Sequence, residues 1–155
     1  RDKDGVSAAL LVAELVGRLK ARGTTLLGLL DELAVAHGVH ATDAFSVRVS
    51  DLSLMPALMA RLRAEPPATI GDTAVTRIDD LAEGDGGLPP TDGLRYFLSD
   101  GSRVIVRPSG TEPKVKVYLE AVEDVPAPDD LAGCREIAAA RLASMRRAFE
   151  ELTRI

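Results

Sequence analysis

The feature that most constrains the fold is a run of alternating apolar and polar residues, joined by short links, over residues 94–121. Alternation with a period of two predicts strands at 94–98, 103–106 and 114–121. Residues 99–102, Ser-Asp-Gly-Ser, lie between the first two strands, and an Asp-Gly pair there is typical of a type I′ hairpin turn. Because strands joined by such short links run antiparallel, this region predicts a mostly antiparallel sheet.

Further strands and helices are predicted on either side of this run. They are strands at 45–49 and 73–78, a helix that ends near Ala64, a turn-rich connection over 81–92, and a final helix with an apolar stripe over 131–152. The order β-α-β-β-β-β-α predicts an α+β fold. We expect a mostly antiparallel four- to five-stranded sheet with helices packed on one face.

The first 42 residues have a different pattern. Residues 6–22 and 25–37 each fit an apolar helix followed by a glycine. The first of them is apolar enough to predict a buried helix, and two such helices cannot form a closed core alone. We therefore predict that residues 1–42 are the C-terminal helices and linker of a preceding domain, and that residues 43–155 form a separate C-terminal domain.

Composition limits the classes of function. The chain has 155 residues and a formal charge of -5, and no apolar run is long enough to span a membrane. The negative charge argues against nucleic acid as a partner, because nucleic-acid-binding domains need a basic surface. The single cysteine, Cys134, cannot form an intramolecular disulfide, which is typical of proteins in the reducing cytoplasm. We therefore expect a cytoplasmic protein without membrane or nucleic-acid partners.

One segment has side chains suited to a phosphate group. Residues 107–113, Arg-Pro-Ser-Gly-Thr-Glu-Pro, connect two expected strands and are more numerous than a hairpin turn requires. An arginine can donate two parallel hydrogen bonds to a phosphate, hydroxyl groups add donors, and a glycine lets backbone N–H groups approach closely. The expected phosphate contacts are Arg107, Ser109, Gly110, Thr111, Lys114 and Lys116, the two lysines sharing one face of the next strand. The alternative is a surface turn with an incidental arginine.

The stretch Arg-Pro-Ser-Gly-Thr-Glu-Pro-Lys at 107–114 resembles the phosphate-binding loop in the C-terminal domain of the α-D-phosphohexomutases, the phosphoglucomutase/phosphomannomutase family. Asp-Lys-Asp-Gly at 2–5, followed by an apolar helix, resembles the end of that family's third domain, so the resemblance covers essentially the whole chain. It implies an isomerase of carbohydrate metabolism that acts by phosphoryl transfer. In that family the fourth domain closes over a hexose phosphate, and its loop holds the phosphate that is not transferred.

The resemblance also implies roles for other residues and for a metal. Lys3 corresponds to a lysine near the active site, where an acid/base role or a phosphate contact is expected, and the whole enzyme uses Mg²⁺. The sequence contains no Thr-Ala-Ser-His-Asn-like phosphoserine stretch, no Asp-Gly-Asp-Gly-Asp metal loop and no Gly-Glu-x-Ser-Gly sugar loop. We therefore expect a C-terminal fragment that has no metal site and is inactive alone. Its expected partners are a phosphosugar and the missing N-terminal domains of the enzyme.

Several residues leave other interpretations open. Ser109 with His37 or His40 could form a hydrolase pair, and the two histidines with Asp43 could form a metal site. A cation could bind to the acidic residues Asp79, Asp80, Glu83 and Asp85. The aromatic residues Tyr96, Phe97 and Tyr118 could form a stacking surface. Helix-end polarity, a solvated loop and core packing are the commoner explanations for such residues. For the function as a whole, the alternative is a non-catalytic α+β phosphate-binding or interaction module that reuses the fold.

Overall fold

The structure, a computed structural model, describes residues 3–84 and 89–154. Residues 1, 2, 85–88 and 155 lie outside the described residues. They include Asp2 of the amino-terminal motif, Asp85 of the acidic alternative and part of the turn-rich connection over 81–92.

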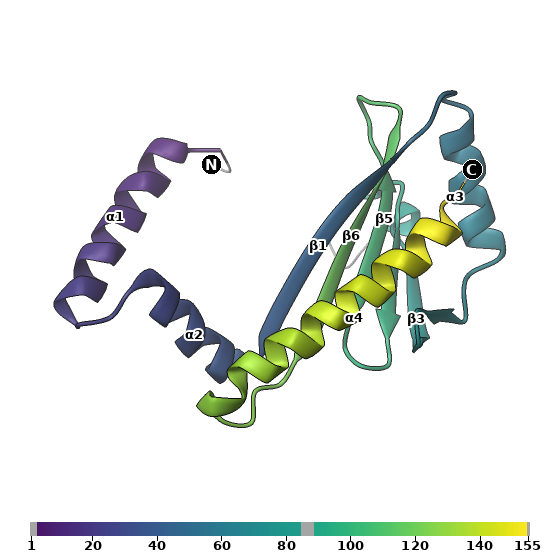
Figure 1. The fold of residues 1–155 in the computed structure, drawn as a ribbon. Coiled ribbons are helices and arrows are strands. Elements are labelled where there is room, and N and C mark those ends of the chain that lie inside the picture. Colours follow the sequence, from purple (N-terminus) through teal and green to yellow (C-terminus); the bar gives the residue numbers. More distant parts are fainter. Residues whose placement is uncertain (1–2, 85–88, 155) are drawn as a thin grey trace.

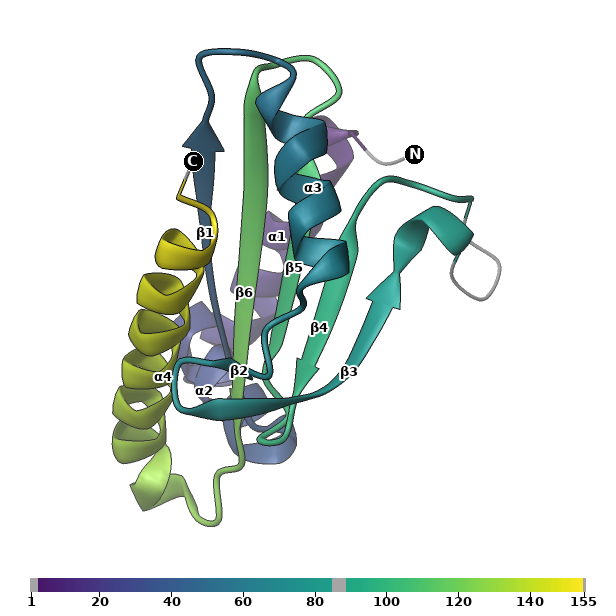
Figure 2. The same cartoon turned by 90° about the vertical axis from the view of Figure 1, so that its right-hand side faces the viewer.

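One six-stranded antiparallel sheet forms the body of the molecule, in the strand order β1-β6-β5-β4-β3-β2 (Figures 1 and 2). The strands are β1 (Val39–Arg48), β2 (Thr69–Ile70), β3 (Thr73–Asp80), β4 (Leu94–Leu98), β5 (Arg103–Pro108) and β6 (Lys114–Glu123). The expected α+β class and antiparallel pairing are confirmed, with six strands in place of four to five. The additional strand, β2, has two residues, which is too short to show alternation in a sequence.

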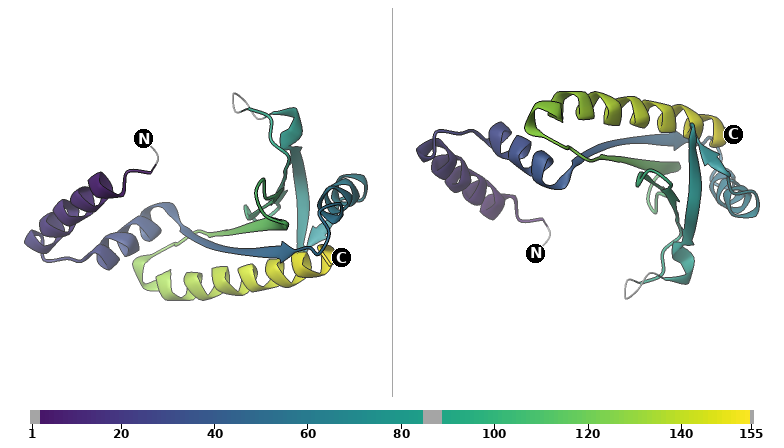
Figure 3. Two further views of the ribbon diagram at one scale, coloured as in Figure 1. Left: turned by 90° about the horizontal axis from the view of Figure 1, so that it is seen from above. Right: turned by 90° about the horizontal axis from the view of Figure 1, so that it is seen from below.

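Within the described residues, four α-helices and two 3₁₀ turns complete the fold. They are α1 (Gly5–Ala21), α2 (Leu26–His37), α3 (Leu54–Ala64), η1 (Leu81–Glu83), η2 (Pro128–Asp130) and α4 (Leu131–Leu152). Figure 3 shows the sheet curling, with α3 and α4 on the outside of the curl and the other face free of helices. Across residues 3–84 and 89–154, none of the helices has the length and apolar character needed to cross a membrane.

The core lies between the sheet and these two helices. Val115, Val117 and Leu119 of β6 are buried under α4, as the predicted alternation requires. Tyr96 of β4 is fully buried and packs its ring edge against Phe149 of α4, with the ring centres 5.5 Å apart. Tyr96 is therefore a core residue and takes no part in a stacking surface.

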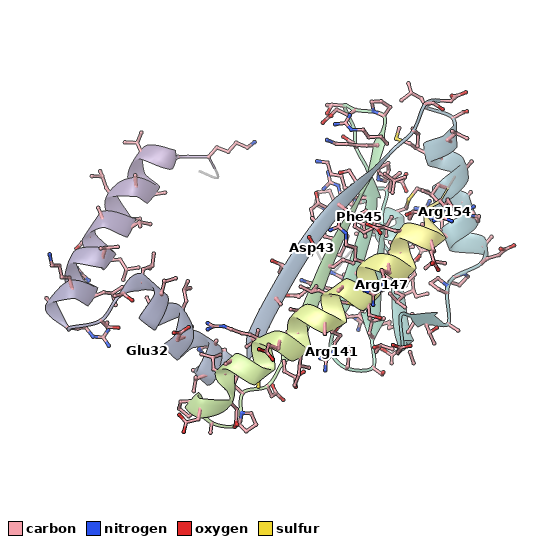
Figure 4. All side chains as sticks on the ribbon, viewed as in Figure 1. Glu32, Asp43, Phe45, Arg141, Arg147 and Arg154 are labelled. Atoms are coloured by element: carbon pink, nitrogen blue, oxygen red, sulfur yellow. The ribbon has the colours of Figure 1, made fainter. Side chains whose placement is uncertain are left out.

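Ion pairs connect α4 to the edge of the sheet. Arg146 donates to the Asp43 carboxylate on β1 over 2.6 Å and lies above the Phe45 ring. Arg141 pairs with Glu123 at the end of β6 over 2.7 Å. Figure 4 labels Asp43, Phe45 and Arg141 on these elements. The hydrogen bond from Arg146 lowers the pKa of Asp43 and keeps its carboxyl group ionised.

The turn between β4 and β5 differs from the type I′ turn predicted at 99–102. A type I′ turn needs positive φ at both central residues, but Gly101 has a φ of +82° and no described residue other than glycine has a positive φ. Instead, Gly101 donates to the Leu98 carbonyl and the Leu98 N–H donates to the Ser102 carbonyl. The turn type is therefore corrected, whereas the hairpin itself is confirmed.

The first strand begins earlier than the predicted segment 45–49. Residues 39–44 pair along β6, from Val39 opposite Glu123 onward, so the ladder extends the strand beyond the clear alternation. The predicted boundary between residues 42 and 43 consequently falls inside β1. The assignment of the two parts to separate domains stays a prediction.

The amino-terminal helices form as predicted but are not buried. Thr25 caps α2, because its hydroxyl accepts a hydrogen bond from the Gly28 N–H. On α1, Val6 and Leu10 are 77% and 69% exposed, and Leu19 is the one buried side chain. Figure 1 shows both helices to one side of the sheet. The predicted burial of the first helix therefore holds at Leu19 alone, since no described element covers most of its other apolar residues.

Candidate functional site

The face of the sheet opposite α3 and α4 carries most of the polar side chains of the strands. We call it the open face, and it lies on the inside of the curl in Figure 3. Alternation and strand register place on it His40, Arg48, Arg77, Asp79, Arg95, Phe97, Arg103, Arg107, Lys114, Lys116, Tyr118 and Glu120. The open face is therefore basic although the chain as a whole is acidic.

Most of the charged side chains on the open face form ion pairs with one another. Arg95 donates to Asp79 over 2.6 Å, and the same carboxylate pairs with Arg77 over 3.2 Å. Arg103 pairs with Glu120 over 2.7 Å. Its two arginine partners account for the charge of Asp79 without a bound cation.

One end of the open face has unmatched positive charge. Arg107 of β5 lies opposite Lys116 of β6, and Arg48 of β1 lies opposite Lys114 of β6. Within the described parts of the chain, Arg48, Arg107 and Lys116 have no carboxylate within ion-pair distance. Lys114 pairs with Glu112 of the adjacent loop over 2.7 Å. We call these four side chains, Arg48, Arg107, Lys114 and Lys116, the cationic end.

The loop at the cationic end is shorter than expected. β5 continues through Pro108, so the connection to β6 comprises residues 109–113, and Arg107 is a strand residue rather than a loop residue. The loop is fixed at its base because the Ser109 N–H donates to the Lys114 carbonyl over 2.9 Å. It is also fixed by Val49, the residue after β1, whose N–H donates to the Pro113 carbonyl over 3.0 Å.

The tip of this loop presents free hydrogen-bond donors. The backbone N–H groups of Gly110, Thr111 and Glu112 have no acceptor among the described residues, and neither do the hydroxyl groups of Ser109 and Thr111. Successive N–H groups of this kind are typical of anion-binding loops. A Cβ atom on Gly110 would meet no atom within 4 Å, so the space above the loop is open. The predicted residues Arg107, Ser109, Gly110, Thr111, Lys114 and Lys116 thus lie together at one end of the sheet.

The pKa of Glu112 reflects the positive electrostatic field at this loop. The hydrogen bond from Lys114 is the largest cause of a lowered pKa of the Glu112 carboxyl group, and the charges of Arg48 and Lys116 lower it further. A carboxylate is thus stabilised at the loop by cations from two strands. The same field would stabilise a phosphate dianion.

Lys3 is not brought together with these residues. It precedes α1, whose main packing partner is α2. Figures 1 and 3 show α1 apart from the loop between β5 and β6. A catalytic role for Lys3 stays a prediction.

The alternative metal and hydrolase sites do not assemble. His40 faces Glu120 on the open face, whereas Asp43 points to α4 on the other face, so the two cannot share a metal. His37, at the end of α2, and His40 lie near the end of β6 at Glu123. Ser109 is hydrogen-bonded to Lys114 at the start of β6, so neither histidine can form a hydrolase pair with it. Asp80 accepts hydrogen bonds from Arg63. The parts of the chain described here hold no group of three metal-ligating side chains, so their residues do not fit a Mg²⁺ site.

The match to a known family lies within the part of the chain that forms the sheet. The model described as "Phosphoglucomutase/phosphomannomutase, C-terminal domain" matches residues 46–132, more than half of the chain. The chain belongs to this family. The match contains the loop, the cationic end and all strands after the first half of β1.

Relatives within the family differ in their named substrates. A probable phosphomannomutase of Haemophilus influenzae is 45% identical over 121 residues, covering 78% of this chain and 24% of the relative. A phosphoglucomutase of Staphylococcus aureus is 30% identical over 77% of this chain and 24% of the relative. A human phosphopentomutase is 33% identical over 77% of this chain and 22% of the relative. The chain therefore spans about a quarter of the length of these relatives.

A solved structure supports the fold. The open form of pp63/parafusin from Paramecium, titled a phosphoglucomutase, superimposes with a TM-score of 0.61 at 21% identity. The superposition covers 99% of this chain and 27% of that one. At this identity the likeness concerns the fold alone, and it includes the two amino-terminal helices together with the sheet.

Proposed function

We propose that this chain is the C-terminal part of a phosphohexomutase and binds the non-transferred phosphate of a hexose phosphate. The observation that carries the proposal is the set of free N–H groups at residues 110–112, beside the cationic end. A phosphate dianion has acceptor oxygens for these donors, and its charge would balance the cations that lack acidic partners. Membership of the phosphoglucomutase/phosphomannomutase family supports this choice of anion.

Each group at the site would act on the phosphate in a different way. Arg107, held on a strand, would donate a fixed pair of hydrogen bonds from one side. The N–H groups and hydroxyls of residues 109–112 would bind the remaining oxygens. Lys114 and Lys116 would contribute charge from the strand below the loop. The site recognises the phosphate without contacting the reacting atoms, so it would anchor the substrate while phosphoryl transfer takes place at its other end.

The remaining chemistry would come from outside this chain. The family resemblance implies a phosphoserine and Mg²⁺ on the N-terminal domains, which would be partners of this one, and the residues described here do not fit the metal. In the proposed enzyme, the sheet domain would close over the active site once the phosphate is bound. We also propose a cytoplasmic setting, in keeping with the single unpaired Cys134. The sugar itself would be selected elsewhere, because this site offers groups for a phosphate.

A titration with inorganic phosphate tests the proposal. We expect phosphate in the millimolar range to shift the amide NMR signals of residues 109–112 in the 155-residue chain. Arg107→Gln should weaken these shifts at least tenfold, because a charge-assisted pair of hydrogen bonds is lost. Arg103→Gln is the matched control, since Arg103 lies on the same strand and face but pairs with Glu120. Unchanged signals, or equal effects of the two variants, would reject the loop as the phosphate site and favour a non-catalytic interaction module.

A further inference from the structure

We propose that Arg48 is an additional phosphate-binding residue, which approaches the bound phosphate from β1 on the side opposite Arg107. This inference rests on the proposed function, because it extends the same anion site across a third strand. Arg48 is not among the phosphate contacts expected from the sequence, because its position depends on how β1 pairs with β6.

The strand register places Arg48 at the base of the loop. It lies opposite Lys114, two residues along from the Ser46–Lys116 pair, so its Cβ is about 5 Å from that of Lys114. The next residue, Val49, donates its N–H to the Pro113 carbonyl of the loop. The backbone that carries Arg48 is therefore hydrogen-bonded directly to the loop that carries the free N–H groups.

The arrangement of charges indicates that an anion belongs between these strands. Like charges placed directly opposite each other destabilise a sheet, yet two such pairs are adjacent here, Arg48–Lys114 and Arg107–Lys116. Elsewhere on the open face the arginines have carboxylate partners. Neither Arg48 nor Arg107 has an acidic partner within residues 3–84 and 89–154. An anion held between the two arginines would remove the repulsion in both pairs.

Glu112 shows that the charge of Arg48 acts at the loop. Its carboxylate binds Lys114, and its pKa is lowered chiefly by that hydrogen bond and further by Arg48 and Lys116. The carboxylate and the free N–H group belong to the same residue. A phosphate bound to that N–H would therefore lie in the field of Arg48 as well.

The spacing of the strands fits a phosphate between two arginines. Arg107 is on β5 and Arg48 is on β1, with β6 between them. Two strand spacings separate the two backbones by about 10 Å. Two extended guanidinium groups directed from such positions would contact opposite sides of one phosphate, above Lys114 and Lys116.

The test compares Arg48→Gln with Arg107→Gln in the phosphate titration described above. We expect Arg48→Gln to weaken phosphate binding by about three- to tenfold, because a partly exposed charged contact is lost. Arg48→Lys should restore part of the loss, since the charge is kept. Arg77→Gln is the control, because Arg77 is on the same face but pairs with Asp79.

The possible outcomes separate the two proposals. A loss with Arg107→Gln but none with Arg48→Gln would overturn this inference and leave the proposed function intact. No loss with either variant would overturn the proposed function. An equal loss with Arg48→Gln and Arg48→Lys, accompanied by shifted signals throughout the sheet, would show a structural role and also reject the inference.

Discussion

Arg107 of β5 faces Lys116 of β6 as its direct partner in the antiparallel ladder. Most cations on the open face pair with a carboxylate, but these two face each other without one in the described residues. The sheet tolerates this repulsion at a position where the loop above it offers three free N–H groups. A bound phosphate would turn an unfavourable pair into a favourable set of contacts.

Removing Arg107 should impair the full-length enzyme mainly through substrate binding. We expect Arg107→Ala to lower kcat/KM by about one to two orders of magnitude, because a charged hydrogen bond is worth roughly 1.5 to 3 kcal/mol. Much of the loss should appear in KM, since the phosphate is held in both the ground and transition states. Steady-state kinetics on glucose 1-phosphate and mannose 1-phosphate measure the effect. Lys116→Ala should cost less, and Ser109→Ala should fall between the two; unchanged efficiency in folded Arg107→Ala would contradict the prediction.

Glu112→Gln should strengthen phosphate binding. The Glu112 carboxylate now binds Lys114 over 2.7 Å and would repel an arriving dianion. The amide keeps the size of the side chain and removes its charge. We expect the phosphate dissociation constant to fall by about two- to fivefold in the NMR titration. Glu136→Gln, a change of the same charge on α4 at the other face of the sheet, is the control. Weaker binding in Glu112→Gln would show that the carboxylate helps to build the site.

The ion pair between Arg63 and Asp80 should make the free energy of unfolding depend on pH in the acidic range. Hydrogen bonds from Arg63 lower the pKa of Asp80 in the folded chain. The pair therefore stabilises the fold above the ordinary aspartate pKa, and this stabilisation is lost as the pH falls through the lowered value. Asp80→Asn should reduce the free energy of unfolding at pH 7 by at most about 1 kcal/mol, because the pair is partly exposed.

Urea unfolding at several pH values measures this dependence. The difference between the wild type and Asp80→Asn should shrink below about pH 4, where the unfolded carboxyl group is protonated. Asp72→Asn is the control, because Asp72 is exposed and makes no ion pair among the described residues. A constant difference across the pH range would mean that Asp80 acts through packing.

Hydrogen exchange should distinguish the two parts of the chain. We expect the amides of α1 to exchange faster than those of β4 and β5, because apolar side chains of α1 are exposed and its main contact is with α2. Exchange measured by NMR or mass spectrometry provides the comparison. Equal protection in α1 and in β4 would mean that both parts unfold as one cooperative unit.

The 155-residue chain should show no mutase activity by itself. It contains no phosphoserine-type stretch, and the described residues do not fit a metal. A coupled assay with glucose 1-phosphate or mannose 1-phosphate should give the background rate. Activity that persists after removal of contaminating enzymes would contradict the assignment of the chemistry to other domains.

The sequence predicted best those features that depend on local pattern. Strict alternation identified β4 to the residue, and the apolar face followed by Gly38 identified α2. The predicted stripe of α4 is also correct for Cys134 and Phe149, which are buried, but Ile137 is half exposed. Helical periodicity alone does not say how far the sheet extends beneath a helix.

Features that depend on how the strands pair with each other could not be predicted from the sequence. The alternation ends at Val106, so the loop is expected to begin at Arg107, but β5 continues to Pro108, which lies opposite Val115. Arg48 gains its position from the register between β1 and β6, which alternation does not determine. Asp100 keeps a negative φ because Gly101 alone takes the left-handed conformation of the turn.

The hydrogen bond from Val49 to Pro113 has a thermodynamic consequence for ligand capture. Together with the Ser109–Lys114 bond and two prolines, it leaves the backbone of residues 109–113 little freedom to lose. A phosphate that binds here would therefore order few new torsion angles. Its affinity would instead be limited by the free energy of removing water from the anion and from the cationic end. We therefore expect phosphate to be released when a higher salt concentration, or a movement of the domain, lets water return to these groups.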